Sequence, residues 1–204
     1  MDIESPFLMR PMMFFMNMEE MLGSDFDKSL AGLKRVSEAS ANAAPTSNVK
    51  IEATTVEPMK IMSIMDSCTS ADIGQKLGAL YGEIGEACKK QNLTQAGAPF
   101  AVYHKVTTNA DGSMNFVLQA GIPIDKAGKT DGRVKYWETP TGNVVKAWHY
   151  GTYEATAQTH ETMDAWMTKN GKTVDGPPWE VYVTDPMVEK DTTKWLIEIY
   201  YPVK

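Results

Sequence analysis

The chain has 204 residues, of which 43% are hydrophobic and 23% are charged, as is usual for a globular protein. Its formal net charge is −6, and it contains no basic run or zinc-type spacing, so direct binding to nucleic acid is not expected. The start of the chain is acidic and lacks the basic region of a signal peptide. Its apolar run, Met12 to Met16, is too short to span a bilayer. We therefore expect a cytoplasmic protein that does not enter the membrane.

Residues 41–48 are small and polar, which is typical of a linker, so residues 1–40 are interpreted as an N-terminal appendage. One amphipathic helix is predicted in this appendage, with Phe26, Leu30 and Leu33 on its apolar face. Because the appendage offers this face no partner, we expect it to dock on the main domain or on a second chain. The second chain could be another copy, giving a homodimer, or a separate protein.

Residues 49–204 contain an internal repeat. Residues 97–103 match residues 176–182 at an offset of 79 residues, and residues 116–124 match residues 195–203 at the same offset. One offset that holds through two separated segments indicates a duplication, and a repeat of this kind decides how the whole fold is interpreted.

Each half of the repeat has the order β-β-α-β-β. In the first half we predict strands at 49–57 and 60–65, a helix at 71–91 with Ser70 as N-cap, and strands at 100–107 and 113–122. In the second half we predict strands at 134–138 and 143–149, a helix at 153–170 ended by Gly171, and strands at 179–184 and 194–201. The predicted fold is α+β: a curved antiparallel sheet covered by two helices, with pseudo-two-fold symmetry. A ligand is expected where the two halves meet.

The two halves differ in ways that suggest a binding site in the second one. Glu180 stands where the first half has Ala101, Glu198 where it has Gln119, and Tyr200 where it has Gly121. Strand alternation places Glu180 with Tyr182 on one face, and likewise Glu198 with Tyr200. Two interpretations remain open: an acidic anchor among aromatic rings, or carboxylates that point into solvent and pair with lysine.

The segment from His149 to Tyr153 joins a strand to the second helix, and Gly151 can take the positive φ that such a turn often requires. We interpret His149 as a structural residue at the strand end rather than as a catalytic base. Trp148 is a candidate core residue that could also form the wall of a pocket. The three histidines are scattered, and neither a metal set nor a cofactor motif is present, so no metal and no cofactor are expected.

The second half resembles the GyrI-like family through His149-x-Gly-x-Tyr153, then 176–182 (Gly-Pro-Pro-Trp-Glu-Val-Tyr) with Asp185-Pro186, and the C-terminal 197–203. This family comprises the effector-binding domain of AraC-type and MerR-type multidrug-responsive regulators, and it also occurs alone. The resemblance implies the duplicated fold and a central cleft for lipophilic, often cationic, aromatic compounds. It maps the family's pocket glutamate onto Glu180 and its pocket aromatics onto Tyr182 and Tyr153. Glu198, Tyr200 and Trp148 complete the predicted ligand-binding set.

No DNA-binding domain precedes the repeat, so a role as a transcription factor is not expected to carry over. Residues 16–35 resemble the last helix of an SRPBCC (START) domain, which precedes a GyrI-like domain in some bacterial proteins. This likeness implies that the chain is either a truncated piece of such a two-domain protein or a version of it that kept only the last helix of the SRPBCC domain.

Three functions follow, in order of preference. The first is a non-enzymatic binder of a lipophilic, cationic or aromatic small molecule. The second is a hydrolase of reactive cyclopropane-bearing natural products, which some stand-alone members are, with Glu180 as general acid and base. The third is a protein-interaction module, as in the gyrase-inhibitory members. The sequence leaves the ligand, its turnover and the oligomeric state undetermined.

Overall fold

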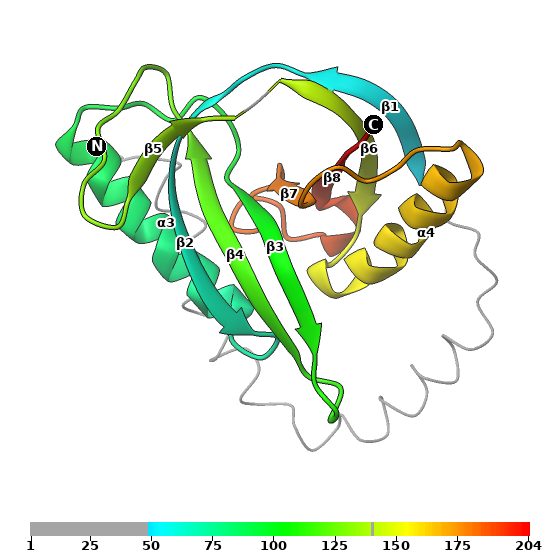
Figure 1. Cartoon of the computed structure of the whole chain (residues 1–204). Helices are drawn as coiled ribbons and strands as arrows, with labels where there is room; N and C mark the ends of the chain where they lie inside the picture. Colours follow the sequence, from blue (N-terminus) through cyan, green and yellow to red (C-terminus); the bar gives the residue numbers. More distant parts are fainter. Residues whose placement is uncertain (1–48, 140) are drawn as a thin grey trace.

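A computed structural model describes residues 49–139 and 141–204 (Figure 1). The appendage, the linker and the predictions made for them lie outside the described residues. The strands are β1 (Lys50–Val56), β2 (Lys60–Thr69), β3 (Phe100–Thr108), β4 (Met114–Pro123), β5 (Lys135–Glu138), β6 (Gly142–Tyr150), β7 (Trp179–Tyr182) and β8 (Leu196–Pro202). The helices are α3 (Ile73–Lys90) and α4 (Thr156–Lys169), with short 3-10 turns η3 (Tyr153–Ala155) and η4 (Thr192–Lys194). The α+β class and the β-β-α-β-β order are confirmed.

All strands of the described region join one antiparallel sheet in the order β1-β6-β8-β7-β3-β4-β2-β5. The first strand of each half pairs with the other half, because β1 pairs with β6 and β5 pairs with β2. These two exchanged strands form the edges of the sheet. The halves are therefore interlocked, and neither can leave the other without losing an edge strand.

The centre of the sheet is where β3 meets β7. Strands β3 and β4 pair Phe100 with Gly121, and β7 and β8 pair Trp179 with Tyr200, which is the same register displaced by the repeat offset. Between the halves, Ala101 of β3 lies opposite Glu180 of β7. These two residues occupy equivalent repeat positions, so the pseudo-two-fold axis passes between them.

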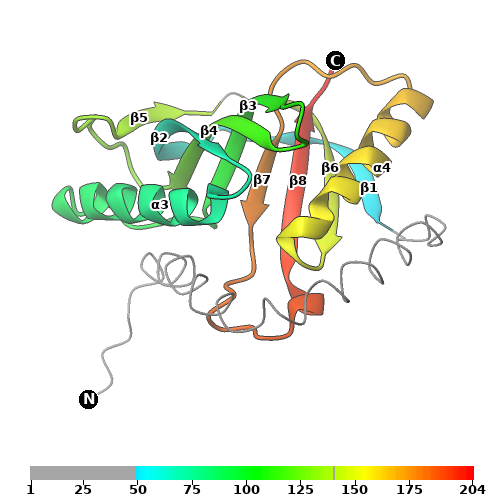
Figure 2. The same cartoon turned by 90° about the horizontal axis from the view of Figure 1, so that it is seen from below.

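Both helices cover the same face of the sheet and lie on either side of β7 and β8 (Figure 2). Helix α3 packs its buried stripe of Leu77, Leu80, Ile84 and Cys88 on β2 and β4. Helix α4 packs Met163 and Met167 on β6 and β8. A cross-strand row at the middle of this face runs through Ile64, Ala120, Ala101, Glu180, Ile199 and Ala147. Neither helix of the described region is long and apolar enough to cross a membrane.

The predicted N-cap of the first helix is wrong. The residue before α3 is Asp72, not Ser70, and its carboxylate accepts hydrogen bonds from the backbone N–H and the hydroxyl of Thr69, at 2.6 and 2.7 Å. Ser70 instead pairs with the backbone of Met114 on β4. Ser70 belongs to the tight turn that follows β2. The helix therefore starts at Ile73, two residues later than the predicted start at residue 71.

Candidate functional site

Glu180 lies in the middle of β7, on the face that the two helices cover, and is only 6% exposed. Its Oε1 atom is 2.9 Å from Nε2 of His160 on α4. Its Oε2 atom accepts hydrogen bonds from the hydroxyls of Tyr103 and Tyr182, at 3.1 and 3.2 Å. Within the described residues, the ion-pair partner of this carboxylate is a histidine rather than a lysine or arginine.

The two tyrosines that donate to Glu180 occupy equivalent positions in the two halves. Their hydroxyl oxygens lie 3.0 Å apart across the pseudo-two-fold axis. Burial raises the pKa of Tyr103 and of Tyr182 well above the usual tyrosine value, and the nearby charge of Glu180 adds to the effect. Both hydroxyls therefore stay protonated and can act as donors near neutral pH.

The backbone fixes this arrangement through a symmetric pair of hydrogen bonds between the halves. The N–H of Tyr103 donates to Pro178 at 2.9 Å, and the N–H of Tyr182 donates to Pro99 at 3.0 Å. Each proline ends the Gly-x-Pro turn that leads into β7 or β3. Because the side chains two residues apart on a strand share a face, Glu180 and Tyr182 both point toward the helices.

Further aromatic and polar groups extend the cluster. Tyr153, at the start of the second helical segment, packs edge-on against Tyr182, with ring centroids 5.7 Å apart. The hydroxyl of Tyr201 on β8 lies 2.8 Å from Nδ1 of His160. His160 thus bridges Glu180 and Tyr201 through its two ring nitrogens.

His149 has a structural role in the turn that leads to α4. Its Nδ1 lies 2.8 Å from the hydroxyl of Thr159, and its Nε2 lies 3.1 Å from the carbonyl oxygen of Thr152. Gly151 takes a φ of 142°, in the region open to glycine. These contacts hold the first turn of α4 against β6 and so position the following residue, His160, over β7.

The structure divides the predicted ligand-binding residues between the two faces of the sheet. Glu180, Tyr182 and Tyr153 gather on the helix-covered face. Glu198, Tyr200 and Trp148 lie on the other face, because the row through Glu198 contains Val181, Trp148 and Lys50 rather than Glu180. The two glutamates therefore belong to separate environments.

Glu198 is already paired with a cation. Its Oε1 lies 2.7 Å from Nζ of Lys146, and its Oε2 accepts a hydrogen bond from the Tyr200 hydroxyl at 2.6 Å. The ammonium groups of Lys146 and Lys50 lie over the Trp148 ring, at 4.4 and 4.0 Å from its centroid. Glu198 therefore fits the second of the two interpretations, in which a strand carboxylate pairs with a lysine.

The difference between Tyr200 and Gly121 is explained by packing. In the second half, the ring of Trp179 stacks on Tyr200 at 5.0 Å with an interplanar angle of 5°. In the first half, the ring of Phe100 lies over Gly121, where a Cβ atom would come within 2.5 Å of the ring. Each half thus fills the same space, with two stacked rings in one case and one ring over a glycine in the other.

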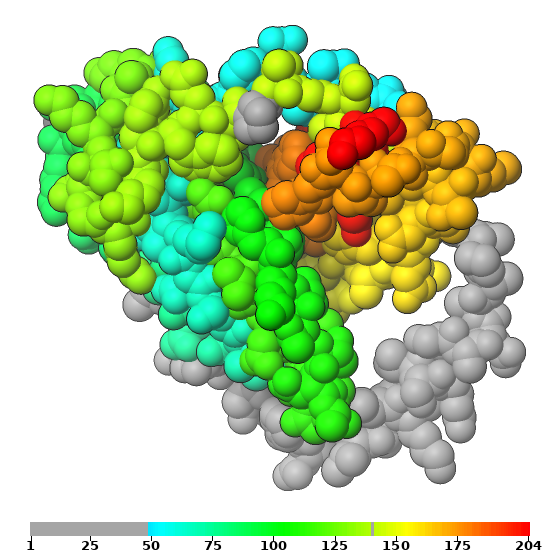
Figure 3. Space-filling view, in the orientation of Figure 1, coloured from blue at the N-terminus to red at the C-terminus, as the bar shows by residue number. Residues whose placement is uncertain are grey.

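An open hollow of about 490 Å³ lies at the C-terminal ends of β2 and β3 and the N-terminal end of β4. The β3–β4 hairpin at this end projects beyond the body of the domain (Figure 3). The lining of the hollow combines Cys68 and Phe116 with polar groups such as Asp72 and Lys105. Phe116 also packs edge-on against Tyr103 at 5.9 Å, so the hollow adjoins the Glu180 cluster through this pair of rings.

Sequence reasoning missed three members of the cluster: His160, Tyr103 and Tyr201. A signal existed for Tyr103, since it matches Tyr182 in the repeat and equivalent residues meet at a symmetry axis. His160 and Tyr201 gave no local signal, because their partners come from other elements. Within the described residues, no group of three His, Cys, Asp or Glu side chains could hold a metal ion.

The fold is a pair of interlocked β-β-α-β-β halves with one buried carboxylate among tyrosines where the halves meet. Over residues 50–204 the sequence matches the GyrI-like small molecule binding domain, and the chain belongs to this family.

Several solved structures share the fold. The crystal structure of the EcmrR C-terminal domain has a TM-score of 0.68 at 18% identity and covers 78% of this chain and 99% of that chain. EcmrR in a cryo-EM structure of its DNA complex has a TM-score of 0.69 at 17% identity, covering 93% and 69%. A structure described as a hydrolase from Listeria innocua has a TM-score of 0.51 at 17% identity, covering 82% and 98%. Likeness at these identities shows the fold alone. Comparison with curated proteins found no match.

Proposed function

We propose that the domain binds a lipophilic cation, with Glu180 as its polar anchor and the surrounding tyrosines as its walls. The observation that carries this proposal is a buried carboxylate whose contacts within the described residues are two tyrosine hydroxyls and one imidazole. A buried carboxylate is costly unless a cation or enough hydrogen bonds compensate it. The two tyrosine hydroxyls are uncharged donors, so they lower that cost without cancelling the negative charge that a cationic ligand would meet.

The walls suit such a ligand. Tyr103, Tyr182 and Tyr153 present aromatic rings next to the carboxylate, and a cation is attracted to the faces of such rings. All three are only partly exposed, so a ligand in contact with them would be shielded from water. The hollow of about 490 Å³ beside Phe116 is lined neither by Glu180 nor by these tyrosines, and it meets the cluster only through the contact of Phe116 with Tyr103.

The test compares tetraphenylphosphonium, a permanent lipophilic cation, with neutral triphenylphosphine oxide by calorimetry and thermal shift. The cation should bind and raise the melting temperature, and the neutral compound should bind much more weakly. Glu180→Gln should weaken cation binding by about tenfold to a hundredfold, the usual value of a charged contact, without unfolding the protein.

Glu198→Gln is the matched control, since it removes a strand carboxylate from the opposite face. It should leave the cation affinity unchanged within about twofold. The proposal fails if Glu180→Gln binds the cation as tightly as the unmodified protein. It also fails if the Glu198 variant loses binding to the same extent.

A hydrolase is the second candidate, favoured by the contact between Glu180 and His160. A carboxylate and an imidazole at 2.9 Å, next to tyrosine hydroxyls, can exchange protons with a substrate or a water molecule. Chromatography would monitor hydrolysis of an electrophilic, cyclopropane-bearing compound. Hydrolysis by the unmodified protein that is lost in Glu180→Gln would support this candidate. The interaction-module hypothesis called for an exposed acidic patch, and the burial of Glu180 does not favour it.

A further inference from the structure

We infer that His160 is an internal counter-ion of Glu180 that a ligand cation displaces, so that where His160 is protonated the binding of each cation releases up to one proton. The inference rests on the proposed function and narrows its ligand class. The site would select permanent cations and strong bases, which keep their charge at a pH where His160 is neutral.

The geometry allows His160 to leave the carboxylate. The side chain of His160 is 24% exposed, whereas that of Glu180 is 8% exposed, so the imidazole lies on the outer side of the contact. It is carried by α4, a surface helix, while Glu180 is held within the sheet. A ligand approaching from the helix side would therefore meet His160 before it meets the carboxylate.

Tyr201 makes both protonation states of His160 acceptable. When the ring is neutral, Nε2–H donates to Glu180 and Nδ1 accepts a hydrogen bond from the Tyr201 hydroxyl. When the ring is protonated, Nδ1–H donates, and the same hydroxyl turns to accept. No polar atom of the pair loses its partner in either state, so the charge of His160 can change without unfolding the site.

The other ionisable groups around the contact do not compete with His160 near neutral pH. Five tyrosines lie around the contact, and burial is the main cause that raises the pKa of each. They are Tyr81 on α3, Tyr103 on β3, Tyr153 in η3, Tyr182 on β7 and Tyr201 on β8. The further charged groups that act on these tyrosines are Glu154 in η3, Asp164 on α4 and Asp185 after β7. Histidine is the side chain whose ordinary charge change falls between about pH 5 and 8.

The exchange has a defined pH dependence. Where His160 is protonated, an incoming cation must displace an existing positive charge, so affinity falls by up to about tenfold for each unit of decreasing pH. Where His160 is neutral, affinity for a permanent cation no longer changes with pH. A weak base behaves differently, because it loses its own positive charge over the same pH range as the histidine. Its affinity therefore rises little when His160 becomes neutral.

The test is calorimetric titration of the full chain with tetraphenylphosphonium between pH 5.5 and 8.5, in buffers of different ionisation enthalpy. The dissociation constant should fall with rising pH and then level off, with up to one proton released per cation at the acidic end. His160→Gln retains an N–H donor for Glu180 but cannot become charged, so its dissociation constant should not change with pH. His104→Gln, which alters an exposed histidine paired with Gln119, should behave as the unmodified protein.

The outcomes separate the two proposals. If the cation binds but the unmodified protein releases no proton in any buffer, His160 is not displaced and the inference is overturned while the proposed function stands. The same conclusion follows if His160→Gln keeps the original pH dependence. If the cation fails to bind at every pH, the proposed function itself fails. Proton release is measured on the unmodified protein, so the test does not depend on the variant folding.

Discussion

Ala101 and Glu180 are cross-strand partners in the β3–β7 pair and also occupy equivalent positions in the two halves. Facing side chains in such a pair have Cβ atoms about 5 Å apart. A glutamate at both positions would place two buried carboxylates against each other. The alanine in the first half leaves one carboxylate beside the axis, with the hydroxyls of both halves available to it.

The symmetric tyrosines should stabilise Glu180 jointly. Tyr103→Phe and Tyr182→Phe each remove one donor to Oε2, and each should lower the free energy of unfolding by about 0.5–1.5 kcal/mol. With either tyrosine gone, the other still donates; with both gone, Oε2 is left without either hydroxyl. The double variant should therefore lose more than the sum of the single losses, by at least about 0.5 kcal/mol in urea unfolding. Additive losses would show that the hydroxyls act independently.

Gly121→Ala should destabilise the first half. The added methyl group would lie 2.5 Å from the ring of Phe100, a buried side chain, and the expected loss is about 1–3 kcal/mol in the free energy of unfolding. Gly142→Ala, also in a strand but with no atom within 4 Å of the added Cβ, should change the free energy by less than about 0.5 kcal/mol. Equal stability of the two variants would mean that Phe100 moves aside freely.

His149→Ala should weaken the connection between β6 and α4. It leaves the buried hydroxyl of Thr159 without its imidazole partner, at an expected loss of about 1–3 kcal/mol in chemical denaturation. His104→Ala, at an exposed position, should cost less than about 0.5 kcal/mol. A loss of the same small size at both positions would contradict the structural role assigned to His149.

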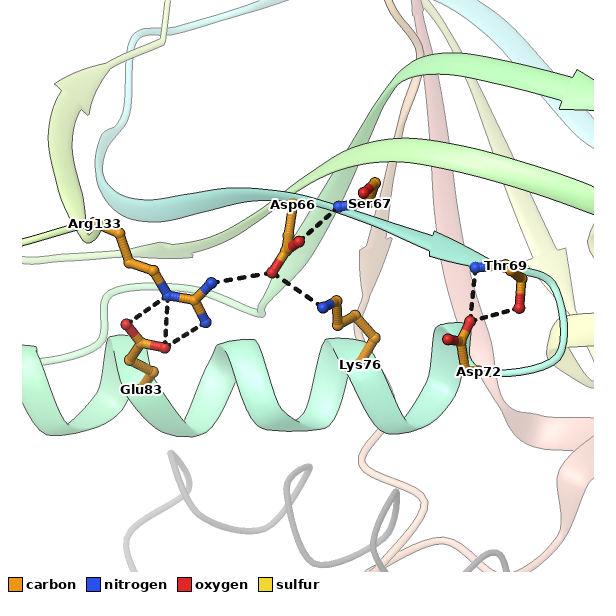
Figure 4. A network of polar contacts seen from close by, with 7 residues as sticks. All are labelled: Asp66, Ser67, Thr69, Asp72, Lys76, Glu83 and Arg133. Carbon is orange, nitrogen blue, oxygen red and sulfur yellow. Dashed lines mark hydrogen bonds and ion pairs between the residues drawn. The ribbon is translucent and has the colours of Figure 1, made fainter.

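The polar network beside α3 should contribute stability that disappears in acid (Figure 4). The Arg133 guanidinium donates to both carboxylate oxygens of Glu83 and so lowers the pKa of that carboxyl. A lowered pKa in the folded state means that the stabilisation is fully present above the ordinary glutamate pKa and is lost as pH falls through the lowered pKa of the folded state.

Glu83→Gln should therefore cost less than about 1 kcal/mol at pH 7, since both side chains are largely exposed and solvent screens the pair. The difference from the unmodified protein should be smaller at about pH 3 than at pH 7, because the unfolded-state glutamate is then protonated and the folded-state carboxyl follows as pH falls through its lowered pKa. Urea unfolding at the two pH values measures this. A difference that persists in acid would assign the effect to packing instead of charge.

The sequence by itself determined the order of the elements and the symmetry of the centre. Apolar residues at helical spacing predicted a helix at 71–91, and the structure has α3 from Ile73 to Lys90. The offset that matches Tyr103 with Tyr182 also describes the registers of the central strands. These features follow from periods of 2 and 3.6 residues and from self-comparison, all of which are readable along the chain.

Only the tertiary structure decided the exchange of β1 and β5, the separation of Glu198 from Glu180, and the contact of His160 with Glu180. Strand pairing depends on which edge is free once the sheet has formed, and no local pattern encodes it. Alternation states which residues share a face within one strand, but the face that the helices cover depends on how they pack. His160 meets Glu180 because a helix from one position in the chain rests on a strand from another, and that relation exists only when the fold is complete.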